Sequence, residues 1–226
     1  MEVFSSIQGE GLLIGKRQVF IRFSGCNIDC NYCDTLESKD ASAGEEYSVD
    51  ELNKIVTALI TPDVDSLEIT GGEPLLHAEF IAEYLTKYPF KAMLETNATL
   101  PDKIGLLNDV IDIVSMDIKL PEHFATKKEW QDVYEKELKS IQVMQNHNMD
   151  YYIKIVVSPT TPLRIIEDIL KDLEGMVSHD VEFIIQPVSP MENWHSKEKL
   201  FEISQKIGEK YRVSIIPQIH KYMEIE

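Results

Sequence analysis

Residues 26–33 read CNIDCNYC, and this run holds Cys26, Cys30 and Cys33, the three cysteines of the 226-residue chain. Thiolates at such short spacing are typical of a metal centre. A four-iron cluster normally takes four cysteine thiolates, so a set of three leaves one iron with an open position. An open position distinguishes a reactive metal site from a closed structural one. The run therefore predicts a metal centre that binds a small molecule.

Two plainer explanations of the cysteines have less support. A disulfide would leave one cysteine unpaired, and the N-terminal residues MEVFSSIQGEG contain neither the basic nor the apolar region of a secretory signal peptide. A structural zinc ion usually takes further ligands from a second close pair, but the nearest histidine, His77, is more than forty residues away. A zinc module without catalysis stays open as an alternative.

Length and composition are those of one globular domain over residues 1–226, with 43% hydrophobic residues. No apolar run approaches the roughly 20 residues of a membrane span. The chain has 39 acidic against 22 basic residues and a net charge of −17, the opposite of a nucleic-acid-binding surface. We therefore expect a cytoplasmic small-molecule enzyme, since exposed thiolates need a reducing compartment, and no nucleic-acid or membrane partner.

Short β-rich runs alternate with helical patterns, which predicts an α/β fold with a parallel sheet. Most runs are continuously apolar, as in strands covered on both faces. The expected strands are Gln18–Phe23, Ser66–Thr70, Lys91–Thr96, Asp112–Lys119, Tyr151–Val157, Val181–Gln186 and Val213–Pro217. The expected helices are Ser48–Ile60, Lys128–His147, Pro162–Leu173 and His195–Tyr211. The stretch between Thr96 and Asp112 is too short for a full crossover helix, so one βα unit is expected to be abbreviated.

Polar residues follow the expected strands at their C-terminal ends, where ligands bind in parallel sheets and barrels. The cysteine run follows the first strand, and the segment 70–74, Thr-Gly-Gly-Glu-Pro, follows the second. Its two glycines let main-chain groups approach a ligand closely, and its acid can accept from an ammonium group. Segments 95–97, 115–119 and 186–188 end later strands. We expect all of them to share one active site.

The C-x3-C-x2-C spacing, with Tyr32 before the last cysteine, is similar to that of the radical S-adenosylmethionine (SAM) enzymes. In that family three cysteines hold a [4Fe–4S] cluster, and the amino and carboxylate groups of SAM bind the free iron. Segment 71–73 resembles the family's GGE motif, which binds the SAM amino group, and segment 95–97 resembles its ribose-binding strand end. The SAM contacts that the resemblance implies are Tyr32, Cys33, Asp34, Gly72, Glu73, Glu95, Asn97, Ser115, Met116, Asp117, Lys119, Gln186, Pro187, Val188 and Ser189.

Further motifs indicate which family of radical SAM enzymes the chain resembles. QGEG (residues 8–11) precedes the cysteine run, CDT (33–35) closes it, and HKY (220–222) lies near the C-terminus. Together with Thr70 and SMDIK (115–119), they resemble the 7-carboxy-7-deazaguanine synthase family from Phe4 to the end of the chain. That family converts 6-carboxy-5,6,7,8-tetrahydropterin to 7-carboxy-7-deazaguanine with loss of ammonia, toward queuosine or archaeosine. It is described as SAM- and Mg²⁺-dependent, homodimeric and built on a shortened TIM-like partial barrel.

The resemblance also implies roles on the substrate side. Arg22 would pair with the substrate carboxylate, which suits a planar guanidinium. Thr35 would bind Mg²⁺, which prefers oxygen ligands, and the α-carboxylate of Glu226 would reach the pterin. The other implied substrate contacts are Ile7, Gln8, Gly9, Glu10 and Thr70. No side chain is assigned a catalytic role, because the SAM-derived radical carries the chemistry; a one-electron donor such as flavodoxin or ferredoxin is expected.

Two features depart from the resemblance or lie outside it. Ala98 stands where the family usually has a glycine after Glu-Thr-Asn, which affects local geometry. We expect segment 36–47 to be a mobile loop and assign it no role; His220 and Lys221 are also unassigned. A glycyl-radical-activating enzyme, which would act on a protein partner, shares C-x3-C-x2-C and GGEP. QGEG before the cysteines and Asp34-Thr35 after them favour the synthase.

Overall fold

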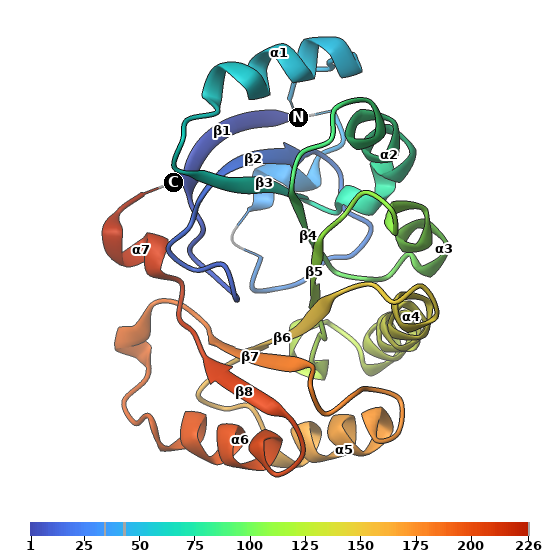
Figure 1. Ribbon diagram of the computed structural model, residues 1–226. Coiled ribbons are helices and arrows are strands. Elements are labelled where there is room, and N and C mark those ends of the chain that lie inside the picture. The colour runs from blue at the N-terminus through green and yellow to red at the C-terminus, as the bar shows by residue number, and fades with distance from the viewer. Residues whose placement is uncertain (34, 43, 226) are drawn as a thin grey trace.

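The computed structural model describes residues 1–33, 35–42 and 44–225, which build one curved eight-stranded sheet (Figure 1). The strands pair in sequence order, β1 antiparallel to β2 and all later neighbours parallel. Among the described residues no pairing joins β1 to β8, so the barrel is partial and open. The strands are β1 (Glu2–Ile7), β2 (Arg17–Phe23), β3 (Val64–Gly71), β4 (Ala92–Thr96), β5 (Ile113–Asp117), β6 (Tyr151–Val157), β7 (Glu182–Pro187) and β8 (Arg212–Ile215).

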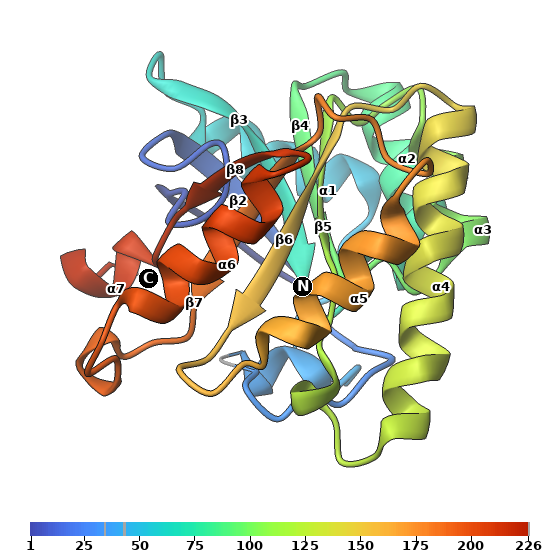
Figure 2. The same cartoon turned by 90° about the horizontal axis from the view of Figure 1, so that it is seen from below.

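The helices follow one another around the outside of the strands (Figure 1), and a view at right angles shows α6, α5 and α4 in succession along one side (Figure 2). They are α1 (Val49–Leu59), α2 (Ala78–Lys87), α3 (Pro101–Ile104), α4 (Lys127–Asn146), α5 (Leu163–Leu173), α6 (Glu198–Gly208) and α7 (Ile219–Met223). α1 begins with the capping box that Ser48 and Glu51 predict.

The expected parallel α/β fold is confirmed, including the abbreviated unit. Between β4 and β5 the chain forms only the four-residue α3 and a 3₁₀ turn, Gly105–Leu107. The seven expected strands and four expected helices are present to within a few residues. β1, α2 and α7 were not among the predicted elements. In segment 36–47, the first residues form a 3₁₀ turn, Leu36–Lys39, that buries Ser38.

Alternation along the strands separates two apolar regions from the polar end of the sheet. On β3, Leu67 and Ile69 belong to the main core that the helices cover. On the inner face, Met93, Tyr152 and Ile184 form a second, small cluster. Two residues later on the same strands and the same face stand Glu95, Lys154 and Gln186, which line a cavity. The inner face is thus polar at the C-terminal strand ends, while the level beneath carries the apolar cluster with the buried Glu68 and Ser115 in register beside it.

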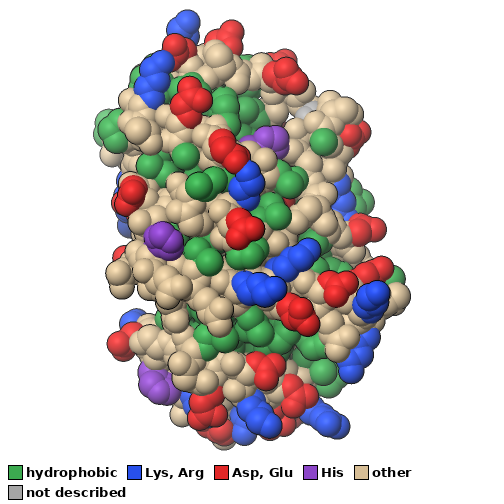
Figure 3. All heavy atoms as spheres, turned by 90° about the vertical axis from the view of Figure 1, so that its right-hand side faces the viewer, with side chains coloured by type: hydrophobic (Ala, Val, Ile, Leu, Met, Phe, Trp, Pro, Cys, Tyr) green, Lys and Arg blue, Asp and Glu red, His purple; other side chains and the backbone are tan. Residues whose placement is uncertain are grey.

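The described part of the chain has no helix long and apolar enough to span a membrane. Acidic and basic side chains are interspersed on the face over α2, α3 and α4, and that face carries no broad basic area (Figure 3).

Candidate active site

A cavity of about 750 Å³ opens at the C-terminal ends of the strands, where the sequence motifs were expected to meet. Residues 150 or more apart along the chain line it together. The predicted residues in its wall are Ile7, Gln8, Gly9, Glu10, Arg22, Cys26, Cys30, Tyr32, Cys33, Thr35, Thr70, Gly72, Glu95, Asn97, Asp117, Lys119, Gln186, Val188 and Ser189.

Four predicted residues that the structure describes do not line this cavity, and two others, Asp34 and Glu226, lie outside the described residues. Met116 packs in the main core, and Ser115 and Pro187 are buried. Glu73 is fully buried behind the wall.

The three cysteines are free thiols on one side of the cavity. Cys30 is buried, and burial raises its pKa to about 11; burial also raises the pKa of Cys26. Thiolates here therefore need a positive partner, which bound iron supplies. No three His, Cys, Asp or Glu side chains of the described chain are arranged to hold a single metal ion. The three free thiols facing one cavity fit a cluster, in which separate irons take separate thiolates.

The loop that carries the cysteines is fixed by the segment after β5. The Asn31 main-chain N–H donates to His123 O at 3.1 Å, and its side chain donates to Glu122 O at 2.8 Å. The Tyr32 ring packs on the His123 imidazole at 4.3 Å between centroids, and its hydroxyl receives a 2.7 Å hydrogen bond from Lys119. Burial lowers the pKa of His123 to about 3, so this imidazole is neutral and accepts from a main-chain N–H.

The two glycines at the end of β3 allow the chain to lie directly against the cysteine loop. Gly71 has φ of 141°, and a Cβ there would fall 2.0 Å from Phe23 O. A Cβ on Gly72 would fall 2.2 Å from Gly25 O. These distances exclude any side chain without moving the backbone. Both glycines still face the cavity, so bare main chain forms this part of its wall.

Glu73 holds the end of β4 in place from behind. Its Oε1 accepts from Leu75 N at 2.9 Å and Thr96 Oγ1 at 2.7 Å, and its Oε2 accepts from Asn97 N at 2.8 Å. Burial raises the pKa of Glu73 to about 7, although the three hydrogen bonds that it accepts each lower that pKa. The carboxylate thus orients Asn97, which does line the cavity.

Ala98 keeps the backbone conformation for which a glycine would be suited. Its φ is 54°, in the left-handed region, which costs an L-residue about 1–2 kcal/mol. The turn is held by side chains, since Ala98 N donates to Thr96 Oγ1 at 2.9 Å and Thr99 N donates to Asn97 Oδ1 at 3.0 Å. The departure from the glycine therefore leaves the turn intact.

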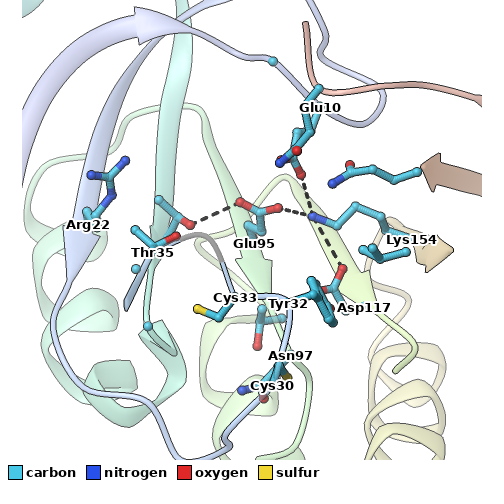
Figure 4. Close-up of a pocket in the computed structure, with 18 of the residues that line it drawn as sticks. Glu10, Arg22, Cys30, Tyr32, Cys33, Thr35, Glu95, Asn97, Asp117 and Lys154 are labelled. Atoms are coloured by element: carbon cyan, nitrogen blue, oxygen red, sulfur yellow. Dashed lines mark hydrogen bonds and ion pairs between the residues drawn. The ribbon is translucent and has the colours of Figure 1, made fainter. Parts of the chain in front are cut away.

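Lys154 is the main site residue that sequence reasoning missed. It lies on β6 and is 4% exposed. Its Nζ is 2.8 Å from Glu10 Oε2 and 3.5 Å from Asp117 Oδ1, and it pairs with Glu95 (Figure 4). The only signal was a single charge in the otherwise apolar run Tyr151–Val157. Arg22 is likewise the single charge in the apolar run Gln18–Phe23, but the family resemblance already assigned it a role.

Arg22 and Thr35 lie across the cavity from Lys154 (Figure 4). The Arg22 guanidinium pairs with Glu2 at 2.9 Å and lies 4.7 Å from the centre of the Phe4 ring. Thr35 precedes the 3₁₀ turn and makes no side-chain capping bond to it, so capping does not explain this residue. Other lining residues without a predicted role are Phe20, Ile28, Glu37, Lys39, Thr96, Val156, Gln218, His220 and Lys221.

The motifs at the two ends of the chain meet at the cavity. Ile219 N donates to Gly9 O at 3.0 Å. A Cβ on Gly9 would fall 2.0 Å from the His220 ring, so the QGEG glycine makes room for this histidine. The Gln218 side chain donates to Glu10 Oε1 at 2.7 Å. The combination of QGEG and HKY therefore has a structural basis in direct contact.

Comparison with known proteins agrees with this geometry. The model of the radical SAM superfamily matches residues 20–173. The 7-carboxy-7-deazaguanine synthase of Methanothermobacter thermautotrophicus is 42% identical, over 98% of this chain and 95% of its own. That of Methanocaldococcus jannaschii is 37% identical, over 98% of both. The chain belongs to the 7-carboxy-7-deazaguanine synthase family.

A solved structure shares the fold of this family member. QueE from Escherichia coli superposes with a TM-score of 0.59 at 22% identity, over 95% of this chain and 91% of its own. As a radical SAM enzyme, the synthase uses a [4Fe–4S] cluster and SAM. Sequence relatives at this level favour neither the glycyl-radical activase nor the zinc module.

Proposed function

We propose that this protein converts 6-carboxy-5,6,7,8-tetrahydropterin to 7-carboxy-7-deazaguanine with loss of ammonia, a step toward queuosine or archaeosine. One observation carries the proposal. The cysteine run, the strand-end motifs and the motifs of both chain ends, which together are typical of the synthase, line one cavity. A cavity of about 750 Å³ has the size of small-molecule sites.

The position of each residue in the cavity then suggests which ligand it binds. Cys26, Cys30 and Cys33 hold the cluster. SAM lies against the predicted strand ends that line the cavity, chiefly Gly72 and Asn97. The cluster and SAM supply hydrogen-atom abstraction by a 5′-deoxyadenosyl radical, which is chemistry of the cofactor. The chain's own contribution is to hold the reacting carbon in place and to exclude water.

The substrate is an anion, and cationic side chains of a strongly acidic chain face the cavity. Arg22, Lys39, Lys119 and Lys154 line it although the net charge of the chain is −17. Arg22 receives the substrate carboxylate in a planar, two-point contact, exchanging it for Glu2. The described wall also holds the carboxylates of Glu2, Glu10, Glu37, Glu95 and Asp117, so the cations act as local contacts for the anion and not as a broad positive field.

The direct test is turnover. Protein reconstituted with iron and sulfide under anaerobic conditions is mixed with 6-carboxytetrahydropterin, SAM and dithionite. We expect 7-carboxy-7-deazaguanine and ammonia in equal amounts, identified by mass spectrometry, and none without SAM. Loaded protein that cleaves SAM but consumes no pterin would contradict the proposed substrate.

Finer assignments belong to the same proposal. We place the enzyme as a single domain over residues 1–226, active as a cytoplasmic homodimer and reduced by a flavodoxin or ferredoxin. Light scattering of the loaded protein reports the dimer. Turnover with reduced flavodoxin in place of dithionite reports the donor.

We also propose that Thr35 places a Mg²⁺ ion against the substrate carboxylate, which would neutralise and orient that anion. Thr35→Ala is expected to raise the Mg²⁺ concentration for half-maximal turnover by about 10- to 100-fold. Iron content should not change, because Thr35 is not a thiolate. Thr35→Ser, which keeps the hydroxyl, is the matched control and should behave like wild type. Wild-type turnover that survives thorough removal of Mg²⁺ would refute this role.

A further inference from the structure

Lys154 is a buried cation on the inner face of β6, at the centre of a set of charges (Figure 4). Its ammonium contacts three carboxylates: Glu10 at 2.8 Å, Glu95, and Asp117 at 3.5 Å. No strand-end motif includes this lysine. We call Lys154 and these three acids the Lys154 network.

The three acids come from different parts of the fold. Glu10 lies between β1 and β2, Glu95 at the end of β4 and Asp117 at the end of β5. Lys154 contacts all three of these acids, although they come from separate parts of the chain. The network therefore joins three walls of the cavity.

Each acid also has a second partner, which extends the connection in two directions. Asp117 pairs with Lys119, whose ammonium donates to Tyr32 in the cysteine run at 2.7 Å. At the other end, Gln218 before α7 donates to Glu10 at 2.7 Å. A continuous series of charged and polar contacts thus runs from the cysteine loop to the C-terminal segment through Lys154.

The charge on Lys154 makes this arrangement stable. Burial lowers the pKa of Lys154, but Asp117, Glu10 and Glu95 together raise it well above its usual range, so the ammonium persists. Burial alone would raise the pKa of Asp117, yet Lys119 and Lys154 lower it. Without Lys154, the three part-buried acids and the nearby buried Glu68 would lose the cation that they share, and like charges at such distances disfavour ionisation.

The acids keep capacity for a ligand. A carboxylate accepts up to about four hydrogen bonds, and the contacts described for two of the acids use fewer than that: Lys154 and Thr70 for Glu95, Lys119 and Lys154 for Asp117. Glu95 and Asp117 both line the cavity in which SAM and substrate would meet.

We propose that Lys154 is a positioning residue that holds Glu10, Glu95 and Asp117 as one preorganised set of hydrogen-bond acceptors. These acceptors serve the amino, amide and hydroxyl groups of both ligands at once. For the pterin this rests on the proposed function; for SAM it rests only on the radical SAM family. Fixing acceptors before binding lowers the cost of ordering them when a ligand arrives.

The test is Lys154→Met, which keeps the length of the side chain and removes its charge. We expect the KM for the pterin and the Kd for SAM each to rise about 10- to 100-fold, the value of one or two charge-assisted hydrogen bonds. Iron content should match wild type. SAM affinity is measured on the cluster-loaded protein by equilibrium dialysis, independently of turnover. Lys91→Met is the control, since its ion pair with Asp65 is on the surface.

A second variant separates charge from packing. Lys154→Met combined with Glu95→Gln removes one charge of each sign from the network, which proteins tolerate better than an unpaired buried charge. We expect it to bind both ligands more tightly than Lys154→Met alone but less tightly than wild type. If the single variant does not fold, the double variant is compared with Glu95→Gln alone, and a further loss of affinity beyond about twofold supports the proposal.

Affinities of Lys154→Met within about twofold of wild type would overturn the proposal. A double variant no better than the single would also overturn it, because volume rather than charge would then matter. Failure of the proposed function gives a different result: wild type would bind SAM but not turn over the pterin. The SAM affinities would still decide the role of Lys154.

Discussion

Cys30→Ala is expected to abolish turnover of the pterin. Cys30 is the most buried of the three thiols and lines the cavity between the other two in sequence. A cluster left with two cysteine ligands is not retained, so the radical cannot form. Activity should fall below about a thousandth of wild type, because uncatalysed reactions are slower than enzyme-catalysed ones by roughly 10⁶-fold or more. Iron per chain should fall from about four, the content of one cluster, toward zero.

The control is another residue of the same loop. Asp29 pairs with Lys39, but its side chain is 95% exposed. Asp29→Asn should therefore retain iron and activity, since exposed ion pairs contribute about 0–1 kcal/mol. Cys26→Ala and Cys33→Ala should match Cys30→Ala. Full iron content in any of these three variants would show that the cluster has a different ligand set, and one zinc per chain in wild type would restore the zinc module.

The sheet was predictable because its strands are covered on both faces. β2 to β8 read as apolar runs between turn residues, and that pattern does not depend on distant partners. β1 is an edge strand whose residues are mostly only part-buried, so Glu2–Ile7 carries no such run. The ten-residue α2 was missed although Ile81, Tyr84 and Leu85 are buried on one face.

Within the site, residues that belong to a motif were predictable, and Lys154, which belongs to none, was not. Parallel strands bring their C-terminal ends to one edge whatever the register, so segments 70–74 and 95–97 had to converge. The contact of Lys154 with Glu10 joins residues 144 apart in the chain. It depends on the pairing order of six strands, which periodicity does not supply. The burial of Glu73 was not predictable either, because it depends on the orientation of one side chain, which the motif does not determine.

The last prediction concerns Glu73, whose motif suggested a ligand contact but whose carboxylate is fully buried. Glu73→Ala would leave three buried donors, on Leu75, Thr96 and Asn97, without acceptors. Each orphaned donor costs about 1–3 kcal/mol, so we expect a loss of roughly 3–5 kcal/mol in the free energy of unfolding. Urea unfolding measures it. Glu79→Gln, at an exposed ion pair with Lys103, is the control and should change stability by at most about 0.5 kcal/mol.

Glu73→Gln tests the charge of the same group. Burial raises the folded-state pKa of Glu73 to about 7, from 4.5. A raised pKa means that protonation favours the folded state, so this stability is fully present below pH 4.5 and is lost as pH rises through 7. Between pH 8 and pH 6 wild type should gain about 1.4 kcal/mol relative to Glu73→Gln, which cannot titrate. A difference between the two proteins that stays constant over this range would show that the three donors keep Glu73 ionised in spite of its burial.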